Sequence, residues 1–136
     1  MAKKSKTAII GKRKKAVARA FIKKGNGLIK INSTPLENIK PEMVKLMIQE
    51  PVKIAGDLSK KVNINVKVSG GGIIGQAEAV RQAIALSLIE FGGKKYKKIF
   101  EEYDRHLIVK DSRRTEPHKP SRSSAGPRRH KQRSKR

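Results

Sequence analysis

The fold depends on one segment, Ser69-Gly70-Gly71-Gly72-Ile73-Ile74-Gly75-Gln76-Ala77-Glu78-Ala79-Val80. Just before it, residues 62–68 alternate between apolar and polar side chains, which predicts a strand with one buried face. After the glycines, apolar side chains recur every three or four residues, which predicts a helix. Its apolar face would comprise Ile73, Ala77, Val80, Ile84, Leu88 and Phe91. Glycine tolerates the backbone angles of a tight turn, so strand, turn and helix form the predicted centre of a core.

The chain is strongly basic, with 34 Lys and Arg against 11 Asp and Glu and a net charge of +23 over 136 residues. This length suits one domain with appendages. We predict a globular domain over residues 1–110, which begins with a basic arm at residues 1–6, and an extended basic tail over residues 111–136. Net charge is +15 in the first part and +8 in the tail. Such a surplus repels itself, so we expect a polyanionic partner.

Several classes of protein are disfavoured by composition. No stretch has the length of a membrane span and no signal-type apolar run follows Met1, so we expect a cytoplasmic protein. No basic amphipathic helix favours a membrane surface. The chain has no cysteine, which excludes disulfides and thiolate chemistry. His106, His118 and His130 are too far apart in sequence to indicate a metal site.

Residues 7–23 favour extended structure, but Lys12-Arg13-Lys14-Lys15 interrupts them with four consecutive cations. Alternate side chains of a strand face opposite sides, so four cations in a row are not all accommodated beside a core. We predict a strand that leaves the sheet here, with Gly11 as a bulge. One interpretation is a solvated edge strand whose charges prevent aggregation. We favour the other, which is phosphate binding.

The remaining elements follow from turn and helix signals. Lys24-Gly25-Asn26-Gly27 predicts a hairpin turn into a strand at residues 28–32. A helix is expected from Pro41 to Pro51, with its apolar side formed by Met43, Val44, Met47 and Ile48. Gly92-Gly93 would end the main helix, and residues 94–103 predict another with its aromatic side chains in the core. Residues 107–109 predict a last strand.

The tail has too few apolar side chains to fold alone, since Ala125 is its one aliphatic residue and Pro117, Pro120 and Pro127 prevent a long helix. We therefore predict an arm that is disordered by itself. Its 26 residues span roughly 85–90 Å when fully extended.

A dinucleotide site is the main enzymatic alternative, because Gly70, Gly72 and Gly75 match G-x-G-x-x-G between a strand and a helix. The parallel strand that should follow is replaced by a lysine-rich helix, and residues 1–110 leave no room for a second half. No Gly-Lys-Ser/Thr follows the glycines, and no carboxylate pair or Ser-His-Asp arrangement is evident. We therefore predict a binding protein without catalytic residues, metal or cofactor.

Five segments resemble the universal ribosomal protein S-nine family of the small subunit. They are residues 11–19, residues 25–32, residues 69–81, Asp111-Ser112-Arg113-Arg114-Thr115-Glu116-Pro117 and Gln132-Arg133-Ser134-Lys135-Arg136. They span nearly the whole chain in the family's order, and the closing Ser-Lys-Arg is highly specific. Residues 103–105 and 111–117 resemble the archaeal and eukaryotic branch, and the lack of a long extension suggests an archaeal type. Two departures are His118-Lys119-Pro120 and the absence of an aromatic residue near Gln132.

The resemblance implies an α+β fold, with a mixed sheet, helices on one face and a left-handed β-α-β crossover. It implies a place in the head of the small ribosomal subunit, bound to ribosomal RNA (rRNA) beside neighbouring ribosomal proteins. It also implies that the tail extends to the anticodon stem-loop of P-site tRNA. No small-molecule substrate or membrane partner is expected.

Together these arguments give the predicted binding residues. For rRNA they are Lys12, Arg13, Lys14, Lys15, Gly70, Gly71, Gly72, Arg113, Arg114, Arg122, Arg128, Arg129, Lys131 and Arg133. For tRNA phosphates they are Ser134, Lys135 and Arg136. A free nucleic-acid-binding protein, such as a chromatin-packing factor, remains the alternative from a different class, because charge and tail suit it equally well.

Overall fold

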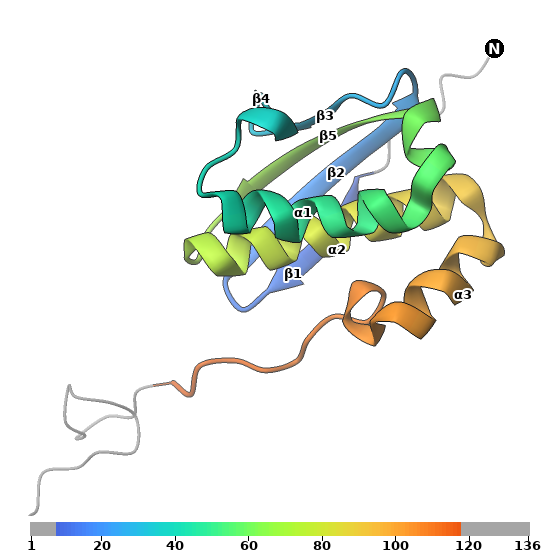
Figure 1. The fold of residues 1–136 in the computed structure, drawn as a ribbon. Helices are drawn as coiled ribbons and strands as arrows, with labels where there is room; N and C mark the ends of the chain where they lie inside the picture. Colours follow the sequence, from blue (N-terminus) through green and yellow to red (C-terminus); the bar gives the residue numbers. More distant parts are fainter. Residues whose placement is uncertain (1–7, 118–136) are drawn as a thin grey trace, which may run out of the picture.

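A mixed five-stranded sheet and three α-helices form the body of the protein in its computed structural model, which describes residues 8–117 (Figure 1). The strands are β1 (Ile9–Arg13), β2 (Ala16–Lys24), β3 (Ile29–Ile31), β4 (Thr34–Pro35) and β5 (Val62–Ser69). The helices are α1 (Glu42–Ala55), α2 (Ile73–Gly92) and α3 (Lys94–Tyr103). All three lie on one side of the sheet (Figure 1). The predicted α+β class with helices on one face is therefore confirmed.

The strand order β1-β2-β5-β3-β4 places β5 in the middle of the sheet. It pairs antiparallel with β2 and parallel with β3. The parallel pair needs a crossover connection, and α1 supplies it on the helical side (Figure 1). The crossover is left-handed, as Figure 1 shows, whereas nearly all such connections are right-handed. This is the handedness that the family resemblance implies.

Helix α2 packs over β1, β2 and β5 and forms the centre of the core. The predicted alternation of β5 is confirmed, since Val62, Ile64 and Val66 are buried. Neighbouring β2 presents small side chains to the helix. They are Ala16, Ala18 and Ala20. The predicted apolar face of α2 is buried only in its middle, because Ile73 and Phe91 at its ends are 65% and 37% exposed.

Gly11 is not a bulge. It pairs regularly with Ala18 across β1 and β2. A Cβ atom at Gly11 would lie 2.2 Å from the Ala79 carbonyl oxygen and 2.7 Å from the Ala83 backbone nitrogen. Glycine is therefore needed because α2 lies directly against β1, and the strand does not leave the sheet but turns back as β2.

The predicted hairpin at residues 24–27 is wrong, because β2 and β3 are not paired with each other. Instead, the backbone N–H groups of Gly25 and Gly27 donate to the carbonyls of Lys61 and Val62, at the start of β5. The turn therefore connects two strands, β2 and β3, that are not neighbours in the sheet, and β5 lies between them. Glycine and asparagine indicated the turn correctly, but they carry no information on a strand that comes 35 residues later.

Two other boundaries differ from prediction. Pro51 does not end α1, which continues to Ala55 with Pro51 buried inside it, and Gly56 ends the helix at φ 58°. Residues 107–109 form no strand, because a 3₁₀ turn at Arg105–Leu107 packs Leu107 into the core. The predicted end of α2 at Gly92-Gly93 and the helix that follows it are confirmed. Its aromatic side chains are not all in the core, because Phe100 is buried but Tyr103 is 55% exposed. Among residues 8–117, no helix is long and apolar enough to cross a membrane.

Candidate RNA interface

Three segments that are distant in the sequence meet at one end of the molecule. They are the hairpin tip at residues 12–15, the glycine turn at residues 70–72 and the C-terminal segment at residues 111–114; together we name them the basic junction. A Cβ atom on Gly70 would lie 2.5 Å from the Lys15 carbonyl oxygen, so the glycine turn touches the hairpin tip. Arg114 Nη1 donates to the Lys14 carbonyl oxygen at 3.1 Å, which holds the C-terminal segment against the same tip.

The hairpin tip presents lysines to solvent. Arg13 pairs with Ala16, so Lys14 and Lys15 form a tight turn, with Lys14 at φ 52°. The side chains of Lys12, Lys14 and Lys15 are exposed, and none is paired with a carboxylate of the described residues. These three lysines are therefore available to an anionic partner, and their predicted contact with rRNA stays a prediction.

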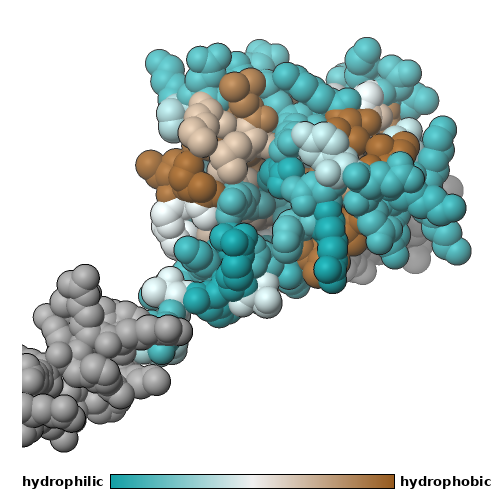
Figure 2. Space-filling view, turned by 60° about the horizontal axis from the view of Figure 1, so that its bottom comes forward, coloured by the Kyte–Doolittle hydropathy of each residue, from teal (hydrophilic) through white to brown (hydrophobic). Residues whose placement is uncertain are grey.

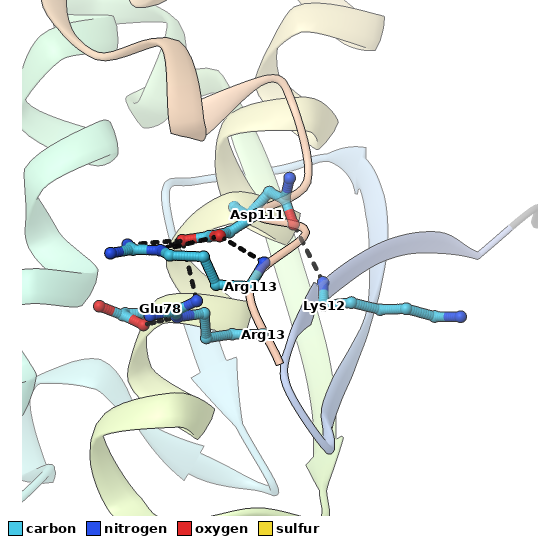
Figure 3. A network of polar contacts seen from close by, with 6 residues as sticks. Lys12, Arg13, Glu78, Asp111 and Arg113 are labelled. Carbon is cyan, nitrogen blue, oxygen red and sulfur yellow. Dashed lines mark hydrogen bonds and ion pairs between the residues drawn. The ribbon is translucent and has the colours of Figure 1, made fainter. Parts of the chain in front are cut away.

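Arg13 differs from its neighbours, because its side chain lies inside a network of ion pairs (Figure 3). Its Nε lies 2.6 Å from Glu78 Oε2 on α2, and its Nη1 lies 2.8 Å from Asp111 Oδ2. Only 14% of the side chain is exposed. The four cations of the run are alike in sequence, but the structure packs the side chain of Arg13 against the body and leaves the three lysines exposed. The predicted rRNA contact of Arg13 stays a prediction.

Asp111 joins the C-terminal segment to this network. Its carboxylate accepts hydrogen bonds from the Arg113 side chain, at 2.7 Å from Nη2, and from the Arg113 backbone N–H at 2.9 Å. The Arg113 side chain, its backbone N–H and nearby Arg13 hold the pKa of Asp111 well below its usual range. The same pairing raises the pKa of Arg113. Asp111 is thus ionised at any physiological pH and fixes where the segment leaves the body.

The backbone conformation of the glycine turn requires glycine at two positions. Gly70 and Gly71 have φ of 79° and 67°, which side chains with a Cβ resist. The Gln76 side chain donates to the Gly70 carbonyl at 3.1 Å and holds the turn at the start of α2. The first turn of α2 carries no acid, so the partial positive charge of the helix N-terminus adds to the lysines beside it.

Sequence reasoning located the cations of the basic junction but missed its carboxylates. Nothing in the sequence signals that Glu78 and Asp111 both pair with Arg13. Figure 2 shows a largely hydrophilic surface where the last described residues leave the body. The other predicted residues lie outside the described part of the chain. They are Arg122, Arg128, Arg129, Lys131, Arg133, Ser134, Lys135 and Arg136. Within residues 8–117, no group of three His, Asp or Glu is placed to hold a metal ion.

Known proteins similar to this chain are archaeal ribosomal proteins. Small ribosomal subunit protein uS9 of Methanococcus maripaludis is 48% identical over 126 residues, which cover 92% of this chain and 94% of the relative. The protein of the same description in Methanococcus vannielii matches to the same extent. That of Desulfurococcus amylolyticus is 52% identical over 116 residues, 85% of this chain and 83% of the relative.

A family model described as ribosomal protein S9/S16 matches residues 11–136, which include every predicted binding residue. These matches confirm the prediction of a structural ribosomal protein rather than an enzyme, and they disfavour a free chromatin-packing factor. With nearly the whole chain covered, the protein belongs to the ribosomal protein S9/S16 family of the small ribosomal subunit.

Proposed function

We propose that the protein binds rRNA in the head of the small ribosomal subunit and that the basic junction is the part of its body that meets RNA phosphates. One observation carries this proposal: two segments that are distant in the sequence bring five exposed cations to one site, beside the glycine turn. They are Lys12, Lys14, Lys15, Arg113 and Arg114. The neighbouring carboxylates, Glu78 and Asp111, are already paired with arginine, so they repel an approaching phosphate less.

The tail extends this function. We propose that the cations from Arg122 to Arg133 neutralise rRNA along the tail's path, and that Ser134, Lys135 and Arg136 contact P-site tRNA phosphates. This rests on the family resemblance and on the place where the basic junction releases the chain. From Thr115 to the last residue, the extended chain reaches roughly 70–80 Å. The proposal places the protein in the cytoplasm, on the ribosome.

The test of the body contact compares two variants of the full chain with equal loss of charge. The first replaces Lys12, Lys14, Lys15 and Arg114 with Gln. The control replaces Lys53, Lys94, Lys97 and Lys98, which are exposed lysines on the helical side. We expect the first variant to lower the slope of log affinity for small-subunit rRNA against log salt by about 3, and to enter small subunits poorly. Equal behaviour of the two variants would contradict the proposal.

A further inference from the structure

The face of the sheet that points away from the helices is uncovered in the part of the chain that the structure describes (Figure 1). Strand alternation places on it the residues of β1, β2, β3 and β5 that do not point into the core. Its central residues are Ile10, Lys12, Val17, Arg19, Phe21, Lys23, Leu28, Lys30, Asn63, Asn65, Lys67 and Ser69. We name this surface the open sheet face.

All the charged side chains of the open sheet face are positive. The face carries five cations and no carboxylate among these residues: Lys12, Arg19, Lys23, Lys30 and Lys67. None of the five pairs with a carboxylate of the described residues. The register of β2 and β5 even sets Arg19 directly opposite Lys67. Like charges opposite each other destabilise a sheet, and an anion bound between the two side chains would relieve this repulsion.

A hollow of about 410 Å³ lies beside this pair. Its lining combines the Phe21 ring and Leu28 with the amides of Asn63 and Asn65 and with lysines. Those lysines are Lys23, Lys30 and Lys67. Asn63 is held in place, since its Oδ1 accepts from the backbone N–H groups of Asn26 and Leu28. This combination suits an unpaired nucleotide. The aromatic ring offers a stacking surface for the base, the amide N–H groups offer donors to the edge of the base, and the lysines offer positive charge to the phosphates.

We propose that the open sheet face binds an unpaired segment of rRNA, with one base stacked on Phe21 and the adjoining phosphates between Arg19, Lys30 and Lys67. The proposal rests on the proposed rRNA-binding function and adds a second contact to it. Lys12 lies on both surfaces, so the RNA track continues from the basic junction onto the sheet. A protein partner fits less well, because it would have to supply carboxylates to five unpaired cations and still match a hollow lined by apolar, amide and lysine side chains.

The first test measures binding of a twelve-nucleotide oligo(U) to the full chain at several salt concentrations. Arg19, Lys30 and Lys67 are replaced together with Gln; the control replaces Lys53, Lys97 and Lys98 on the helical side. We expect the sheet variant to lower the salt slope by about 2 and the control to leave it nearly unchanged. Phe21→Leu should weaken binding at least about fivefold at an unchanged slope, since it removes a stacked base without removing charge. Equal slopes, or full affinity of Phe21→Leu, overturn the proposal.

The second test locates the contact in the ribosome. A photo-crosslinking phenylalanine analogue is placed at Phe21, or at Leu46 as a control on exposed α1, and small subunits are isolated. Crosslinks from position 21 to rRNA, absent from position 46, support the proposal. Subunits that incorporate the protein but crosslink position 21 to protein, or to nothing, overturn it. Failure of the wild-type chain to enter subunits would contradict the proposed function instead, and the oligo(U) measurement then decides the sheet contact alone.

Discussion

At the scale of single residues, Gly11 sets the distance between α2 and the sheet. The atoms that a Cβ at this position would meet are backbone atoms of Ala79 and Ala83, which do not swing away as a flexible side chain does. Gly75 is different, although it lies in the first turns of the same helix. A Cβ there would meet its nearest neighbours at 3.8 Å, which is ordinary contact. The structure therefore excludes a side chain at Gly11 but has room for one at Gly75.

Gly11→Ala should therefore destabilise the fold by about 1–3 kcal/mol, the cost of an overpacked core. Gly75→Ala is its matched control and should stabilise by about 0.5–1 kcal/mol, because alanine favours a helix more than glycine does. Urea unfolding of the full chain, followed by circular dichroism, measures both. The same sign for the two substitutions would show that the contact with α2 is not what requires Gly11.

Asp111 gives a prediction about pH. A carboxylate whose pKa is lowered by folding contributes stability above its unfolded pKa, and loses it only as pH falls through the lower folded value. The segment should therefore stay attached at about pH 4, near the ordinary pKa of aspartate. In Asp111→Asn it should detach at every pH. The attachment of the segment is measured by NMR, from the chemical shift of the Arg113 amide proton, which is donated to Asp111.

The control for that measurement is Asp57→Asn. Asp57 pairs with Lys60 at 3.8 Å, with both side chains more than 80% exposed. An Arg113 shift that moves as much in Asp57→Asn, or that does not move in Asp111→Asn, would mean that Asp111 does not hold the segment.

At the scale of elements, Arg81 on α2 connects all three helices. Its Nε lies 2.6 Å from Glu50 Oε2 on α1, and its Nη2 lies 3.1 Å from Asp104 Oδ2, just after α3. The Tyr103 hydroxyl donates to the same Glu50, and this hydrogen bond to a carboxylate raises the pKa of Tyr103. Burial works to raise the pKa of Asp104, but hydrogen bonds from the His106 backbone N–H and Arg81 outweigh it and the pKa is lowered.

Arg81→Met should lower the free energy of unfolding by about 1–3 kcal/mol, since it leaves two partly buried carboxylates without their cation. Lys60→Met removes a cation from an exposed ion pair and should cost less than about 0.5 kcal/mol. Combining Arg81→Met with Glu50→Gln should cost less than the sum of the two single changes. Strict additivity would rule out a direct interaction between these two side chains.

Elements with a regular hydrophobic pattern of their own were predictable from the sequence. The alternation of β5 gave a strand with one buried face, and the periodicity of α2 gave a helix, although the middle of α2 is buried on nearly every side. The pairing of β2 was not predictable. Its turn residues are correct for a hairpin, yet β5 fills the space that a hairpin would have closed. Residues 107–109 have the composition of a strand, but the burial of Leu107 against the helices overrides that preference.

The candidate site was predictable in its charges and not in its geometry. The residue types alone showed that Lys14 and Arg114 are cations, and the glycines around Gly70 indicated a turn. Which cation is neutralised inside the protein depends on tertiary contacts, so Arg13 was indistinguishable from the lysines beside it. The open sheet face was missed for the same reason, because its residues alternate with core residues along four separate strands.

At the scale of the whole molecule, charge is divided between a folded body and a tail. All 11 acidic residues lie before residue 118, and the residues after it carry a net charge of +8. Four of these acids form the ion pairs of Arg13 and Arg81 within the described residues. Residues 119–136 have no acids with which to neutralise their own cations, which favours phosphate as their partner.

Deleting Ser134, Lys135 and Arg136 should weaken P-site tRNA binding for all tRNAs alike and leave subunit assembly intact. Contacts to phosphate position a nucleic acid without reading its sequence, so no tRNA should be favoured. Losing two cations should lower the salt slope by about 1.5. Filter binding of several tRNAs to purified small subunits measures this, with Lys94→Gln and Lys95→Gln together as the charge-matched control. A defect confined to one tRNA would contradict the proposed role.

The central position of β5 separates the order of synthesis from the order of folding. When a ribosome has made residues 1–61, the segments of β2 and β3 have been synthesised, but β5, which lies between them in the sheet and pairs with both, has not. The sheet closes only after residues 62–69 arrive, and its core is sealed only by α2 after that. Until residues 62–69 have been synthesised, each new copy is therefore a polycation that cannot close its sheet, and it emerges beside the RNA of the ribosome that makes it.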